Sequence, residues 1–129
     1  DTDTGEVKVV KLTSAADPGR VIHPQNVEGQ LHGGMDMGAG FALREEYVAG
    51  KARDWVTFKF PNIRHAIDMD TILVETPREL GTLGSVGIGE MAMVATAPAI
   101  VNAIRDATGA MVCELPATPE RVRAALAAR

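Results

Sequence analysis

Val27-Glu28-Gly29-Gln30-Leu31-His32-Gly33-Gly34-Met35 is the stretch of sequence that decides the fold. Its apolar residues Val27, Leu31 and Met35 recur at helical spacing, which predicts a helix over residues 27–46 with these three side chains facing inward. Glycine in a helix interior costs up to about 1 kcal/mol relative to alanine. The glycines of this segment therefore predict a close approach to the helix, either by neighbouring backbone or by a ligand.

The other elements follow from similar local patterns. Alternating apolar residues predict strands at residues 6–15, 55–60 and 71–75. Thr96 and Pro98 are typical of a helix start and Gly109 of a helix end, and a last helix should begin at Thr118. Separate short strands and two or three helices, without a regular β-α-β alternation, predict the α+β class.

Composition limits the classes of function. The chain has 129 residues, of which 46% are hydrophobic and 23% charged, and this fits one globular domain. A net charge of -4 with both signs interspersed predicts no nucleic-acid surface and no membrane surface. Cys113 is the single cysteine, which excludes an internal disulfide and fits a cytoplasmic location. We expect its side chain to pack in the core.

The first five residues, Asp1-Thr2-Asp3-Thr4-Gly5, have the composition of a turn that joins two strands. A strand is predicted after this turn, but the sequence contains none before it. We therefore expect the chain to be a fragment or a split subunit of a larger protein, with an exposed strand edge over residues 7–12.

Residues 81–90 contain four glycines and should form an irregular loop that ends at Glu90. Glycines free backbone amides to point at an anion, and a carboxylate follows directly. A phosphate loop is excluded because the Lys-Ser/Thr pair is missing, and Gly87-x-Gly89 lacks the third glycine of a dinucleotide site. A surface loop with a solvated glutamate is the remaining alternative.

Other catalytic patterns are weak. His23, His32 and His65 lie far apart in the sequence and form no metal-ligand pair on one helix. Ser14 and Ser85 do not stand in the Gly-x-Ser-x-Gly pattern of a serine hydrolase. We interpret the histidines as structural residues.

Four motifs occur in one order, at residues 27–35, 58–61, 87–90 and 115–122. Together they resemble the molybdopterin-binding large subunit, or domain, of xanthine dehydrogenases, aldehyde oxidoreductases and carbon monoxide dehydrogenases. There is a particular likeness to bacterial aldehyde oxidoreductases, and it covers nearly the whole chain. Residues 1–129 would then be the C-terminal part of a molybdenum-cofactor-binding domain. His23, before Pro24, departs from the asparagine that many relatives carry there.

The resemblance implies a role for each site residue. Glu90 would be the general base next to the molybdenum, a task that a nearby carboxylate can perform if its pKa suits. The backbone amides of the loop would face the cofactor, and either Asn26 or Gln30 would place an amide side chain against it. The loop residues with this role are Ser85, Val86, Gly87, Ile88 and Gly89.

The resemblance also implies the chemistry of the whole enzyme. It would hydroxylate an aldehyde or a heteroaromatic carbon with water as the oxygen source, using a molybdopterin-type cofactor. Iron-sulfur clusters are expected in the missing part or in partner subunits, and the complete protein should form a homo-oligomer. The alternative is a non-catalytic assembly or scaffold module that retains the fold.

Overall fold

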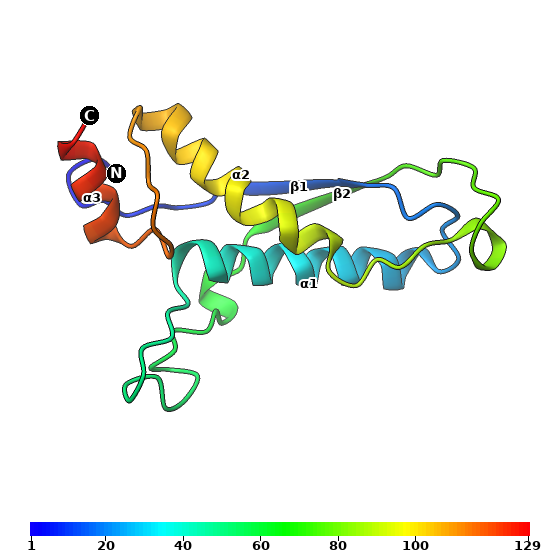
Figure 1. The fold of residues 1–129 in the computed structure, drawn as a ribbon, viewed down its shortest axis with the longest axis horizontal. Coiled ribbons are helices and arrows are strands. Elements are labelled where there is room, and N and C mark those ends of the chain that lie inside the picture. The colour runs from blue at the N-terminus through cyan, green and yellow to red at the C-terminus, as the bar shows by residue number, and fades with distance from the viewer.

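The computed structural model describes residues 1–129 and has the predicted α+β composition (Figure 1). Two strands and three helices follow one another as β1 (Lys11–Ala16), α1 (Pro24–Leu43), β2 (Asp68–Leu73), α2 (Met91–Thr108) and α3 (Pro119–Ala127). Short 3-10 turns occupy Ile63–His65 and Thr82–Gly84.

The two strands form a parallel pair connected through α1. They pair in register from Lys11 opposite Asp68 to Ala16 opposite Leu73. A parallel pair needs a long crossover connection, and α1 supplies it. The helix also covers one face of the sheet, where Leu12 and Met69 pack against its buried side chains.

Helix α1 confirms the central prediction. Val27, Leu31 and Met35 are all buried against the sheet. The helix starts at Pro24, earlier than predicted, because His23 is its N-cap and accepts a hydrogen bond at Nδ1 from the backbone N–H of Asn26 at 3.2 Å. Proline fits the first helical turn, because an N–H at that position would have no hydrogen-bond partner within the helix.

Four of the five glycines of α1 divide into two groups. A Cβ on Gly34 would lie 3.0 Å from the Cβ of Ala92 in α2, and one on Gly38 would lie 2.6 Å from the Cβ of Thr96. These two glycines therefore allow α1 and α2 to pack closely. A Cβ on Gly29 or Gly33 would meet no atom of the chain within 4 Å, so packing within this chain does not explain these two glycines.

Helix α2 begins at Met91, so the predicted start near Thr96 is wrong. Pro98 lies inside the helix, where proline removes a hydrogen bond to the carbonyl of Val94. Val94 is exposed, and water can reach that carbonyl. The predicted end is confirmed, because Gly109 adopts the left-handed conformation with φ 76°.

The predicted strand at residues 55–60 is wrong. The segment forms turns in which Thr57 bonds Asp54 and Lys59 has a φ of 65°. Figure 1 shows that the connection from α1 to β2 projects away from the rest of the chain. The alternating pattern has no partner strand there, and Trp55 remains 72% exposed.

The other boundaries differ more modestly. β1 begins at Lys11 rather than at residue 6, and β2 covers Asp68–Leu73 rather than residues 71–75. Cys113 is exposed and lies outside any strand, so its predicted core position is wrong. The last helix is confirmed, because the hydroxyl of Thr118 accepts a hydrogen bond from the backbone N–H of Arg121 at 3.3 Å.

Arg121 connects α3 to two other parts of the chain. Its guanidinium bonds the carboxylate of Glu46 at 2.9 Å, the carboxylate of Glu114 at 2.8 Å and the carbonyl of Pro116 at 3.0 Å. These charge-assisted bonds join the segment after α1 to the segment before α3. None of the three helices has the length and apolar character of a membrane-spanning segment.

Candidate functional site

A groove of about 400 Å³ brings the two predicted groups of site residues together. One wall is the first part of α1, and the other is the glycine loop before α2. The turn after β1 closes one end. The predicted site residues that line the groove are Asn26, Gln30, Ser85, Val86, Ile88 and Gly89.

Backbone pairing fixes the loop to the turn after β1. Gly19 and Ser85 form an antiparallel bridge. The N–H of Arg20 donates to the carbonyl of Gly84 at 3.1 Å, and the N–H of Val86 donates to the carbonyl of Pro18 at 3.0 Å. Gly19 has a φ of 63°, a conformation that favours glycine and lets the two segments approach.

Asp17 anchors this turn. Its carboxylate accepts hydrogen bonds from the N–H of Gly19 at 3.0 Å and of Thr76 at 3.3 Å, and it pairs with Arg78 at 2.9 Å. Hydrogen bonds from Thr76 and Gly19, together with the Arg78 contact, hold the pKa of Asp17 well below its usual range. The ionised carboxylate thus ties the turn to the segment after β2.

Gln30 links α1 to the glycine loop. Its Nε2 donates to the carbonyl oxygen of Gly89 at 2.7 Å, across 59 positions of sequence. The side chain of Asn26 has no hydrogen-bond partner, although its backbone N–H donates to Nδ1 of the capping residue His23. The two amides therefore differ, because Gln30 positions the loop and Asn26 remains free in the groove.

The loop presents donors that the chain itself leaves unused. The backbone N–H groups of Gly87, Ile88, Gly89 and Glu90 donate no hydrogen bond within the chain. Gly87 and Gly89 leave open space where a Cβ would stand. Neutral donors with free access fit a ligand rich in oxygen acceptors, such as the oxo group and pterin of a molybdenum cofactor.

Glu90 follows the loop directly and is the N-cap residue of α2. Its carboxylate makes no capping hydrogen bond and no ion pair, and the residue is exposed. Only its backbone carbonyl makes a hydrogen bond, which it accepts from the N–H of Met93 at 3.2 Å. Glu90 does not line the groove, although the residue directly before it, Gly89, does.

The groove also contains residues that were not predicted as site residues. Arg20 and Ile22 line it from the turn after β1, and His23 lines it from the helix cap. Histidine can replace asparagine at this cap position, because Nδ1 of His23 accepts the capping hydrogen bond. No local pattern marks Arg20, since its place depends on the pairing of the turn with the loop.

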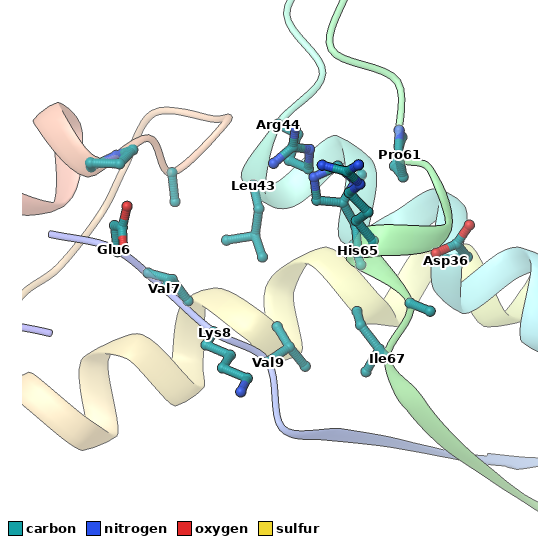
Figure 2. Close-up of a pocket in the computed structure, with 16 residues that line it drawn as sticks. Glu6, Val7, Lys8, Val9, Asp36, Leu43, Arg44, Pro61, His65 and Ile67 are labelled. Atoms are coloured by element: carbon teal, nitrogen blue, oxygen red, sulfur yellow. The ribbon is translucent and has the colours of Figure 1, made fainter.

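A second cavity, of about 450 Å³, lies at the other end of α1. Figure 2 shows that Leu43, Arg44 and His65 line one side of it, and Val7 and Val9 the other. Side chains of both charge signs line it, among them Glu6 and Arg64, and none of the predicted site residues does. The predicted site therefore corresponds to the groove at the start of α1.

Known proteins resemble this chain along nearly its whole length. The family model of the molybdopterin cofactor-binding domain matches residues 1–67, more than half of the chain. The aldehyde oxidoreductase of Megalodesulfovibrio gigas is 38% identical over 99% of this chain. The nicotine 6-hydroxylase large subunit of Paenarthrobacter nicotinovorans is 36% identical over 95% of it.

Solved structures have the same fold. The crystal structure of the aldehyde oxidoreductase from Desulfovibrio desulfuricans superposes with a TM-score of 0.92, at 39% identity over 96% of this chain. The chain spans only 14% of that structure, and 14% and 16% of the two curated relatives. This chain belongs to the molybdopterin cofactor-binding domain family of the aldehyde oxidoreductases and xanthine dehydrogenases.

Proposed function

We propose that this chain is the C-terminal part of the molybdenum-binding domain of a hydroxylase, and that Glu90 is its general base. The hydrogen bond from Gln30 to the carbonyl of Gly89 carries the proposal. It joins the helix and the glycine loop, the two motifs expected to contact the cofactor, directly before Glu90. A scaffold module has no need of an unpaired carboxylate at that position.

Each part of the site has a separate task. When bound, the molybdenum cofactor supplies a Lewis-acidic metal that acidifies water and takes up electrons from the substrate. The free N–H groups of Gly87 to Glu90 bind and orient its acceptor oxygens. Gln30 holds the loop, and the side chain of Asn26 is available to the pterin. Glu90 accepts the proton that the reaction releases.

The substrate class is proposed from the relatives. One is named an aldehyde oxidoreductase and another a nicotine 6-hydroxylase, so an aldehyde or a heteroaromatic ring carbon is the substrate we propose. The remaining part of the subunit and iron-sulfur domains would complete the enzyme as a homo-oligomer in the cytoplasm. Electrons would leave through those iron-sulfur clusters.

The Glu90→Gln change in the intact subunit tests the role of Glu90. The amide keeps the size of the side chain but cannot accept a proton near neutral pH. Enzyme reduction by substrate, normalised to molybdenum content, should fall about 10²- to 10⁴-fold. The molybdenum content itself should stay at the wild-type level.

Glu79→Gln is the matched control, because Glu79 is exposed and makes no hydrogen bond or ion pair. Its normalised rate should equal that of the wild type. A Glu90→Gln rate within about threefold of wild type, far from a general-base effect, would contradict the proposal. Loss of molybdenum with a normal rate per bound metal would instead assign Glu90 a structural role.

A further inference from the structure

Glu90 is held in place by its neighbours in the chain, because its own carboxylate makes no capping hydrogen bond. On one side of it, the carbonyl of Gly89 accepts the hydrogen bond from Nε2 of Gln30 at 2.7 Å. On the other side, the start of α2 lies against α1 (Figure 1), and Ala92 is buried there in a core cluster with residues of α1. The position of the carboxylate therefore depends on how the start of α2 is seated on α1.

Gly34 lies directly against this first turn of α2. A Cβ on Gly34 would lie 3.0 Å from the Cβ of Ala92 and 3.2 Å from the backbone nitrogen of Met93. The N–H of Met93 is also the group that donates to the carbonyl of Glu90, at 3.2 Å. Gly34 is thus in contact with the turn of which Glu90 is the N-cap.

Gln30 and Gly34 contact the chain on opposite sides of Glu90. They stand four positions apart, so they share one face of α1. The atoms of α2 next to Gly34 are a Cβ and a backbone nitrogen, which have no rotamer freedom. A side chain at position 34 would therefore displace the first turn of α2 itself, by a few tenths of an ångström.

We propose that Gly34 is a positioning residue for the general base, because the absence of a side chain lets the first turn of α2 seat Glu90 within reach of the reacting proton. The inference rests on the proposed role of Glu90. Proton transfer needs donor and acceptor atoms within about 2.6–3.2 Å of each other. A misplacement of about 1 Å can cost about 10²-fold in rate. A smaller shift at the start of α2 should therefore slow the chemical step while the cofactor stays bound.

Gly34→Ala in the intact subunit tests the positioning role. The rate of enzyme reduction by substrate, normalised to molybdenum content, should fall about tenfold, whereas the molybdenum content should stay at the wild-type level. Hydrogen exchange at the amide of Met93 should become about tenfold faster, because the new Cβ presses on its nitrogen. An unchanged normalised rate or an unchanged exchange at Met93 would each overturn the proposal.

A second substitution in α2 tests whether the contact itself is responsible. Ala92→Gly in the Gly34→Ala background removes the atom that would lie at 3.0 Å, and it should recover at least about threefold of the lost rate. Ala95→Gly in the same background is the matched control, because Ala95 is exposed on the same helix and loses the same helix propensity. It should recover none of the rate. Equal rates of the two double variants would overturn the proposal.

The Glu90→Gln background shows whether Gly34 acts through Glu90. Without the base, Gly34→Ala should change the residual rate by less than about twofold. A loss of about tenfold in both backgrounds would mean that Gly34 acts on another group, and would overturn the proposal.

The proposed function fails in a different way from the positioning role. A rate of Glu90→Gln close to that of the wild type would reject the general base itself. A large rate loss in Glu90→Gln with an unaffected Gly34→Ala would reject only the positioning role of Gly34.

Discussion

Gln30 and Gly89 are joined by a hydrogen bond of 2.7 Å, although 59 positions separate them in the sequence. The bond runs from a side-chain amide on α1 to the backbone carbonyl directly before Glu90. The position of the proposed base therefore depends on a helix that is distant in the sequence.

Gln30→Ala should loosen the glycine loop. A hydrogen bond of this kind contributes about 0.5–1.5 kcal/mol net, so local opening should increase by up to about tenfold. Hydrogen exchange in the intact subunit at Val86, whose N–H donates to the carbonyl of Pro18, measures the effect, together with molybdenum content. Gln25→Ala is the control, because Gln25 is exposed in the first turn of the same helix and makes no side-chain bond. Equal exchange in the two variants would show that Gln30 does not hold the loop.

Local sequence signals predicted the elements that depend on neighbouring residues. The spacing of Val27, Leu31 and Met35 predicted α1 and its buried face. Gly109 and Thr118 predicted a helix end and a helix start, because each acts on backbone groups within a few positions. The glycine loop before Glu90 was predictable for the same reason, because its signal is the glycine content of the segment itself.

Features that depend on distant partners were not predictable from the sequence. The strand pattern at residues 55–60 would need a neighbouring strand, and this chain provides none, so turns form instead. The parallel pairing of β1 with β2 and the bond from Gln30 to Gly89 are likewise set by the tertiary fold. Pro98 does not mark a helix start, because its lost backbone bond is tolerated in an exposed turn of α2.

The glycines of α1 give a second prediction. Gly38→Ala should destabilise the intact subunit, because the new Cβ would lie 2.6 Å from the Cβ of Thr96 in the buried contact with α2. The Cβ added by Gly33→Ala would meet no atom of this chain within 4 Å. Alanine at this position should therefore raise the stability by up to about 1 kcal/mol. Chemical unfolding of both variants measures the contrast.

The result for Gly33→Ala also shows whether a ligand or neighbouring backbone approaches the helix at this glycine. A loss of molybdenum from Gly33→Ala, with unchanged stability, would indicate that a ligand approaches the helix there. A destabilised Gly33→Ala with normal molybdenum content would point to packing by another part of the subunit. Equal stability of Gly33→Ala and Gly38→Ala would contradict the packing of α1 on α2.

Glu45 and Glu46 are neighbours with opposite environments. Glu46 pairs with Arg121 at 2.9 Å. Glu45 has one carboxylate oxygen that is buried without a hydrogen-bond partner. Burial raises the pKa of Glu45, and the charge of Asp36 raises it further. Ionised Glu45 is therefore unfavourable in the folded chain, whereas the carboxylate of Glu46 has a cationic partner.

Glu45→Gln should stabilise the protein at neutral pH, and Glu46→Gln should destabilise it. A carboxyl group whose pKa is raised by folding lowers the stability as pH rises above its unfolded value of about 4.3. The gain from Glu45→Gln should thus be small below about pH 4 and complete above the raised pKa. Thermal unfolding of the intact subunit between about pH 4 and 8, the range that brackets this titration, measures it. A pH-independent effect of Glu45→Gln, or a loss of stability as large as that of Glu46→Gln, would mean that another part of the subunit pairs with Glu45.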